Sequence, residues 1–153
     1  MNMKTKPFNS NTEISLRILL TLLCNERNTN LTTDRIAILD FVTIYSREFG
    51  ISENNLHGDN YFSFTEYATR RKQINENIKQ LVLKRMVKIS TTDKGFTYSI
   101  TNSGKKVAES LSSAYAHQYH HYAKLARGYV QNKSEADISR LIAEESARAL
   151  IRR

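Results

Sequence analysis

The stretch YATRRKQINENIKQLVLKRMVKISTTDKGFTYSIT, residues 67–101, decides the fold that we expect. Its first half repeats apolar residues at helical spacing, which predicts a helix over residues 72–85 with one buried face. Its second half alternates apolar and polar residues on either side of Asp-Lys-Gly, residues 93–95. Two alternating runs around such a turn predict a β-hairpin over residues 87–101.

Helical patterns flank this stretch on both sides. Upstream, residues 12–23 have an apolar face wide enough for a helix buried on most sides, and residues 31–50 form a second amphipathic pattern. The capping-box sequence SFTE, residues 63–66, predicts a short helix over 64–69, and a further helix follows the hairpin. This order predicts a mainly α winged helix-turn-helix fold, with about five helices, one hairpin wing and residues 72–85 in the recognition position.

The positive charge of the chain is concentrated in one block. The net charge is +8, and residues 70–106 contain ten Lys or Arg but only two acids, so the rest of the chain is balanced. Such a block is typical of a surface that binds nucleic acid or an acidic partner. The candidate binding residues are Arg70, Arg71, Lys72, Asn75, Lys79, Lys84, Lys88 and Lys94.

These residues suit duplex DNA in specific ways. We expect Lys72, Asn75 and Lys79 on the exposed face of the recognition helix, Arg70 and Arg71 in the turn before it, and Lys94 at the hairpin tip. Lys and Arg neutralise phosphates, and an Asn side chain can reach a base edge. A winged helix that docks on an acidic protein would carry the same charges, so this alternative stays open.

The sequence predicts three parts: a flexible N-terminal arm over residues 1–10, the winged domain over 11–130, and a C-terminal amphipathic helix over 131–153. Amphipathic rings in the last part of the winged domain, and a narrow apolar stripe in the tail, suit a protein interface. The predicted partner interface consists of Tyr115, Tyr119, Tyr122, Ile138, Leu141 and Ile142. A helix with so narrow a stripe is marginal in water, so we expect the tail to be mobile until bound.

Catalytic motifs are sparse. His117 and His121 are four residues apart and can share a metal, but no Asp, Glu or Cys lies within a turn of them, so a Tyr/His-rich contact face is favoured. Carboxylates such as Asp34, Asp40 and Glu66 suit helix caps or the surface. The single cysteine, Cys24, excludes an internal disulfide. We therefore expect no enzyme, no cofactor and no bound metal.

A membrane partner is not expected either. No apolar run reaches the length of about 18 residues that a membrane span needs, and residues 1–10 lack the apolar region of a secretory signal. These features predict a cytoplasmic protein.

Several segments together resemble the middle components of ABC-three component (ABC-3C) systems, most of all middle component 2. The segments are NSNTEISLRILLTLL (9–23), LTTDRIAILDFVTIYSREFG (31–50), NNLHGDN (54–60), YATRRKQINENIKQLVLKRMVKI (67–89) and GFTYSITNSGKKVAESLSSAYAHQYHHYAKLA (95–126). The resemblance covers residues 9–126, and we find no counterpart of the tail. Gly58 stands where the family pattern after Asn55-Leu56-His57 has proline.

The resemblance implies partners that composition does not reveal. The family includes the accessory subunit of Lamassu-type anti-phage systems, and such subunits assemble with an SMC- or Rad50-like coiled-coil ATPase and an effector, often a nuclease. It implies a non-catalytic adaptor in defence against phages or plasmids, with double-stranded DNA as a further partner and the ATP and magnesium sites on the ATPase. A free-standing dimeric transcriptional regulator of the MarR or PadR kind is the alternative, since FTYSITNSGKKVAESL (96–111) fits it equally well.

Overall fold

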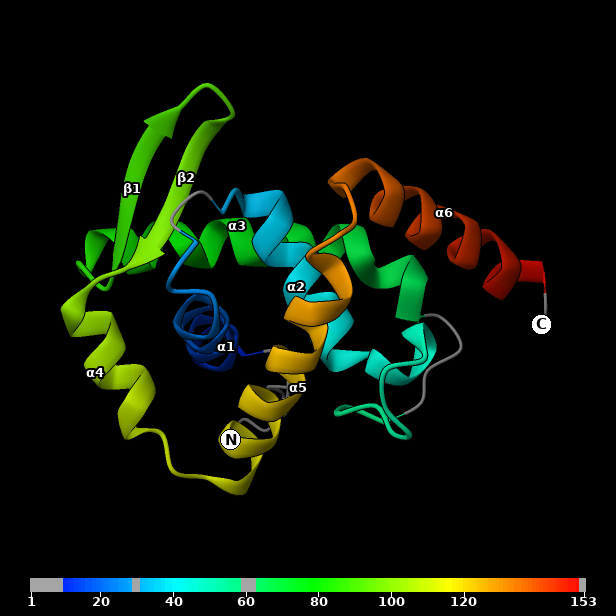
Figure 1. The fold of residues 1–153 in the computed structure, drawn as a ribbon, viewed down its shortest axis with the longest axis horizontal. Helices are drawn as coiled ribbons and strands as arrows, with labels where there is room; N and C mark the ends of the chain where they lie inside the picture. The colour runs from blue at the N-terminus through cyan, green and yellow to red at the C-terminus, as the bar shows by residue number, and fades with distance from the viewer. Residues whose placement is uncertain (1–9, 29–30, 59–62, 152–153) are drawn as a thin grey trace, which may run out of the picture.

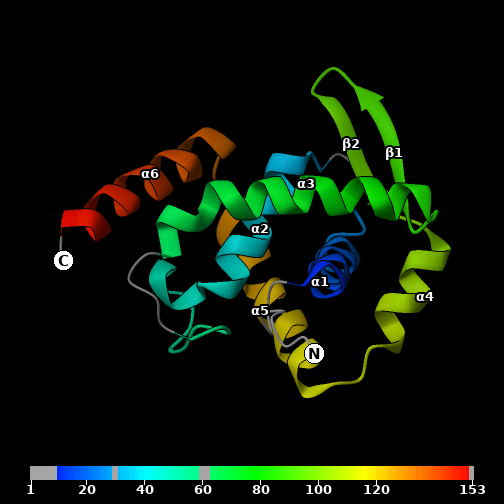
Figure 2. The ribbon, with the colours of Figure 1, turned by 180° about the vertical axis from the view of Figure 1, so that it is seen from behind.

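The computed structural model describes residues 10–28, 31–58 and 63–151, so the predicted arm lies outside the described residues except for Ser10. Figures 1 and 2 show the chain from two opposite sides. Its elements are α1 (Asn11–Cys24), α2 (Thr33–Ile44), the 3-10 turns η1 (Ser46–Phe49) and η2 (Ser63–Glu66), α3 (Tyr67–Leu83), β1 (Val87–Thr92), β2 (Gly95–Ile100), α4 (Asn102–Ser110), α5 (Ala114–Val130) and α6 (Glu135–Ile151). The prediction of a mainly helical fold with one hairpin is confirmed, with six α-helices in the described ranges instead of about five.

Helix α1 lies at the centre of the molecule, where Figure 1 shows it end-on between α2, α3, α4 and α5. Its wide apolar face explains this position, because Ile14, Ile18 and Leu22 are each about 1% exposed. Full burial of such a side chain contributes about 1.5–3 kcal/mol. The Ser10 side chain caps the helix by accepting a hydrogen bond of 3.1 Å from the Glu13 amide. Cys24 is also buried.

The hairpin begins at the C-terminal end of α3 and projects beyond the core (Figure 2). Its strands pair in antiparallel register from Val87 with Ile100 to Thr92 with Gly95, as the alternating pattern predicts. Val87 and Tyr98 anchor its base in the core, and the Tyr98 amide donates a hydrogen bond of 2.8 Å to the Leu31 carbonyl. Leu31 thus adds an isolated bridge to the outer edge of β2.

The segment before the hairpin differs from the prediction. Instead of a short helix over 64–69 and a second over 72–85, η2 leads directly into one long helix, α3. The predicted break between the two helices lies at residues 70–71, shortly before Ile74, which is the first aliphatic residue of the buried stripe. Tyr67 extends the buried face by another two turns, because its ring packs edge-on against Phe41 with the ring centres 5.3 Å apart.

Helix α6 packs on the chain's own surface, against α2 and η2. Ile138 and Ile142 are only 1% and 4% exposed, so the prediction that they face a partner is wrong, while Leu141 is half-buried. Arg35 holds the link before α6 by donating to the carbonyls of Val130 at 2.8 Å and Lys133 at 3.1 Å. Among the described residues, no helix combines the length and the apolar character needed to cross a membrane.

Candidate binding surfaces

The exposed face of α3 carries the central part of the predicted binding surface. Ile74, Ile78 and Leu81 anchor the opposite face in the core, which turns Lys72 and Lys79 to solvent and leaves Asn75 half-buried. Neither lysine forms an ion pair with any described residue. Their ammonium groups are therefore available to phosphates or carboxylates.

Arg70 does not belong to this surface, contrary to the prediction. Its side chain is buried, and one guanidinium nitrogen donates to the Tyr45 hydroxyl at 3.0 Å. The guanidinium also lies over the Tyr45 ring, 5.3 Å from the ring centre, and 3.8 Å from Glu66. Arg70 falls on the core side because α3 starts at Tyr67 and has no turn at residues 70–71. It is a packing residue that links α3 to the end of α2.

Arg71 is exposed but already has a partner. Its Nε atom lies 2.5 Å from Asp34 Oδ1, and this hydrogen bond and charge raise the pKa of the guanidinium. The pair joins α3 to the first turn of α2, where a carboxylate also suits the helix dipole. A phosphate would have to compete with Asp34 for Arg71.

Further cations follow α3 towards the hairpin. Lys84, Lys88 and Lys94 are exposed, and Lys94 lies in the turn between β1 and β2. The hairpin rises from the C-terminal end of α3 (Figure 2), so Lys84, Lys88 and Lys94 come after Lys72 and Lys79 along these consecutive elements. The sequence prediction placed these residues correctly on the surface.

Arg85 is a surface residue that sequence reasoning missed as a binding candidate. It follows Lys84, the C-cap residue of α3, and has a left-handed φ of 63°. The amides of Arg85 and Met86 donate to the carbonyls of Val82 and Leu81, both at 3.0 Å, which is the hydrogen-bond pattern of a Schellman C-cap. Glycine usually occupies this position, because a side chain there costs about 1–2 kcal/mol. The chain retains an arginine in this strained conformation, directly after the exposed Lys84.

We therefore expect Arg85→Gly to stabilise the folded chain by about 1 kcal/mol, because the left-handed conformation suits glycine. Urea unfolding of the two proteins measures this difference. Arg85→Ala is the control, since it removes the charge but keeps the strain. A variant that is less stable than the parent chain would contradict this account.

A buried ionic cluster ties α1, α2 and α5 together. Arg17 Nε donates to Asp40 Oδ1 at 3.0 Å, the Tyr119 hydroxyl donates to the same oxygen at 2.5 Å, and Thr21 lies 2.9 Å from Tyr119. Burial opposes the charge on Asp40, but the Arg17 charge and these hydrogen bonds hold the pKa of its carboxyl below the ordinary value. Asp40 is thus a core anion and not the cap or surface residue that we expected.

The cluster also corrects the predicted aromatic interface. Tyr119 is fully buried, so the prediction that it contacts a partner is wrong. Its apolar ring packs in the core while its hydroxyl donates to Asp40, a pairing that helical spacing alone does not reveal. Tyr115 is half-buried, and its hydroxyl lies 2.7 Å from His57 Nε2. Burial and the nearby Arg17 lower the pKa of His57 to about 3, so this imidazole is neutral. Tyr122 is half-buried beside His121.

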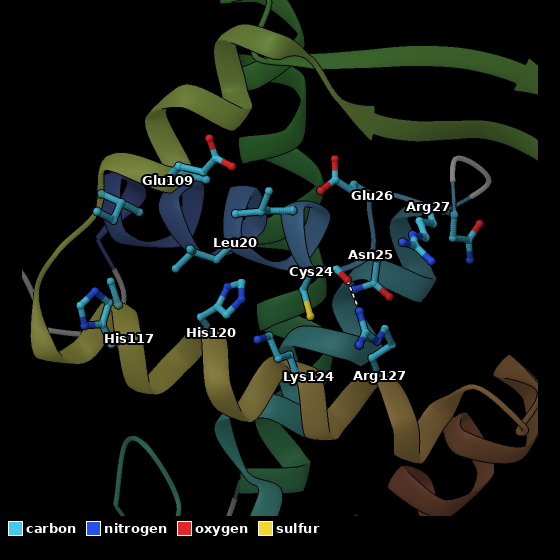
Figure 3. A pocket seen from close by; sticks show the side chains of 15 residues that line it. Leu20, Cys24, Asn25, Glu26, Arg27, Glu109, His117, His120, Lys124 and Arg127 are labelled. Carbon is cyan, nitrogen blue, oxygen red and sulfur yellow. Dashed lines mark hydrogen bonds between the residues drawn. The ribbon is translucent and has the colours of Figure 1, made fainter.

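A groove of about 820 Å³ lies between α4 and α5, over the last turns of α1. Figure 3 shows His117, His120, Lys124 and Arg127 of α5 along one edge, with Glu109 and Glu26 along the other.

The Arg127 guanidinium donates to the Cys24 carbonyl, while burial raises the pKa of the Cys24 thiol. Burial, Lys124 and Arg127 lower the pKa of His120. Within the part of the chain that the structure describes, no three His, Cys, Asp or Glu form a group suited to a metal ion.

Comparison with known proteins gives the family. The family model described as ABC-three component (ABC-3C) system Middle Component 2 matches residues 7–152. No curated protein and no solved structure matches the chain. The matched range extends beyond the resemblance over 9–126 and includes α6, so the family pattern does have a counterpart of the tail. A match over nearly the whole length shows that the chain belongs to the ABC-3C Middle Component 2 family, whose members are components of a multi-protein system.

Proposed function

We propose that the chain is the non-catalytic adaptor of an ABC-3C complex that defends a prokaryotic cell against phages or plasmids. Its partners in this proposal are an SMC- or Rad50-like coiled-coil ATPase and an effector nuclease, as in Lamassu-type systems. The observation that carries the proposal is the family match over residues 7–152, which makes the chain one component among several. In such a system the adaptor acts in the cytoplasm and leaves ATP hydrolysis and cleavage to its partners.

The arrangement of the elements supports a winged helix-turn-helix interpretation. Helix α2 precedes α3, the hairpin follows α3 directly, and Leu31 adds a third short segment beside β2. In winged-helix proteins the helix before the hairpin takes the recognition position and the hairpin is the wing. On this interpretation α3 and the hairpin form the binding side of the adaptor.

We further propose that this side contacts duplex DNA. The contacting residues are Lys72, Asn75, Lys79, Lys84, Arg85, Lys88 and Lys94. The lysines and Arg85 are exposed cations without an acid paired to them among the described residues. Phosphate contacts of this kind supply most of the affinity of nonspecific DNA binding, which suits a complex that must recognise foreign DNA of any sequence.

The alternative, a free-standing dimeric regulator, is less well supported. Such regulators dimerise through the apolar faces of long flanking helices. Here α1 is enclosed by the core, and the stripe of α6 is covered by α2 and η2. The helices that would build the dimer are therefore occupied within one chain.

Co-expression with the ATPase and effector encoded beside this chain tests the adaptor proposal. We expect one complex of all three proteins on size exclusion, and loss of the ATPase–effector association when this chain is omitted. Mass photometry of the purified complex gives the stoichiometry. A chain that purifies alone as a dimer and binds a palindromic site upstream of its own gene would instead be a regulator.

A further inference from the structure

The groove between α5 and α4 has the form of a helix-binding site. Its floor is apolar and consists of Leu20, Leu23, Ala108, Leu111 and Ala116. Along its α5 edge, His117, His120, Lys124 and Arg127 recur at helical spacing on one face (Figure 3). Ten residues of helix separate the first from the last, which corresponds to about 15 Å at 1.5 Å per residue. A groove of this length accommodates about three turns of a second helix.

The two edges of the groove carry opposite charges. The α5 edge has two cations, Lys124 and Arg127, and no acid among the lining residues. The opposite edge has Glu109 from α4 and Glu26 from the segment after α1, and Lys105 lies 3.1 Å from Glu26. Arg27 stands beyond Glu26 at the far end (Figure 3). Because Lys105 balances Glu26, Glu109 carries the acidic character of this edge. An apolar floor between Lys124 on one edge and Glu109 on the other favours one orientation of an amphipathic helix.

We propose that this groove receives an amphipathic helix of a partner subunit, with acidic side chains facing Lys124 and basic side chains facing Glu109. The occupant's apolar stripe covers the half-buried Leu23 and Leu111, and its charged flanks fix its direction. The inference rests on the proposed adaptor function and names the surface that the adaptor uses. The DNA-binding side is a different surface, since none of the proposed DNA contacts lines the groove.

Other occupants fit less well. The first ten residues of the chain contain Lys4 and Lys6 and no acid, so they lack the acidic flank that Lys124 requires. A second copy of this chain has a net charge of +8 and is repelled by the first. A duplex backbone offers phosphates to the α5 edge but nothing to Glu109 or to the apolar floor.

Photocrosslinking in the co-expressed complex tests the site directly. Benzoylphenylalanine replaces Lys124 in one variant and Gln118 in the control, because Gln118 is exposed on the same helix but does not line the groove. We expect a crosslink from position 124 to one partner protein, mapped by mass spectrometry to a helix with an apolar stripe between acidic and basic flanks. A crosslink to DNA, or equal crosslinking from both positions, would overturn the proposal.

Charge-reversal variants provide a second, independent test of the groove. Lys124→Glu and Glu109→Lys are each expected to weaken assembly with that partner at least about tenfold, because like charges then face each other. Lys106→Glu, on the exposed side of α4 and outside the groove, is expected to change the affinity less than twofold. All three positions are exposed, so thermal unfolding is expected to be unchanged. Unimpaired assembly of both groove variants would refute the groove alone, whereas failure of the intact chain to assemble would refute the adaptor function itself.

Discussion

Asp40→Ala is expected to destabilise the chain by about 3–5 kcal/mol, because it removes the carboxylate that balances the buried charge of Arg17. Arg17 is 2% exposed, and its guanidinium faces Asp40 through Nε at 3.0 Å and through a second nitrogen at 3.4 Å. Tyr119 would lose the acceptor of its hydroxyl at the same time. Domains have a total stability of about 5–15 kcal/mol, so this one substitution removes a large part of it. Urea unfolding at pH 7 measures the difference.

A double substitution separates the cost of an unpaired charge from the value of the pair. Arg17→Met with Asp40→Leu removes both charges and keeps apolar volume, and such replacements are often neutral or stabilising. We expect the double variant to be several kcal/mol more stable than Asp40→Ala. Equal stability of the two variants would mean that packing around Tyr119, and not the uncompensated charge, dominates.

The same cluster makes stability depend on pH in a defined direction. The pKa of Asp40 is lower in the folded chain than in the unfolded chain. Its contribution to stability is therefore fully present above the unfolded value of about 4 and is lost as the pH falls through the folded value. The stability difference between the parent chain and Asp40→Ala is expected to shrink on acidification below about pH 4, which urea titrations at several pH values detect.

Local patterns in the sequence were sufficient to predict the hairpin and the buried face of α3. Val87 and Ile89 alternate with polar residues, and the turn residues fix the register, so no distant contact is needed. Ile74, Ile78 and Leu81 repeat on one face of a helix, which is equally local information. The exposed positions of Lys72 and Lys79 follow from that face, because residues opposite a buried stripe meet solvent.

The wrong predictions concern amphipathic side chains whose environment depends on distant residues. Arg70 is buried because Tyr45, 25 residues earlier, offers it a hydroxyl and a ring. Tyr119 is buried because Asp40, 79 residues earlier, accepts its hydrogen bond. Arginine and tyrosine have both a polar and an apolar part, so composition and spacing fit either a core or a surface position. Only the tertiary fold distinguishes these positions.

The groove and the position of α6 depend on tertiary structure in the same way. The stripe of Ile138 and Ile142 is as suitable for a partner as for the chain itself, and it packs against η2 and α2, which are far away in the sequence. The groove needs α4 and α5 to diverge from the end of α1, and no sequence motif marks that geometry. The tail therefore offers a partner less apolar surface than the sequence indicated. The groove beside α5 is the partner surface that we propose instead.

Lys72→Glu with Lys79→Glu is expected to weaken binding of the assembled complex to duplex DNA at least about a hundredfold at low salt, since two phosphate contacts are replaced by repulsion. Both side chains are exposed, so the fold is expected to tolerate the change. Arg70 and Arg71 are unsuitable for this test, because Arg70 is buried on Tyr45 and Arg71 is paired with Asp34. Fluorescence anisotropy with a labelled duplex measures the affinity.

The salt dependence shows whether these lysines contact phosphates. Each lost phosphate contact lowers the slope of log affinity against log salt by about 1, so the double variant is expected to lose about 2 from the slope. Lys124→Glu is the control, because Lys124 lies on α5 and outside α3 and the hairpin. Both variants are compared with the parent as isolated chains, where Lys124→Glu is expected to leave the slope unchanged. If the α3 variant as an isolated chain keeps the DNA affinity and salt slope of the parent chain but no longer assembles with the partner proteins, α3 binds an acidic protein and the DNA proposal fails. Loss of affinity and slope together, with assembly intact, is the result that a direct DNA contact requires.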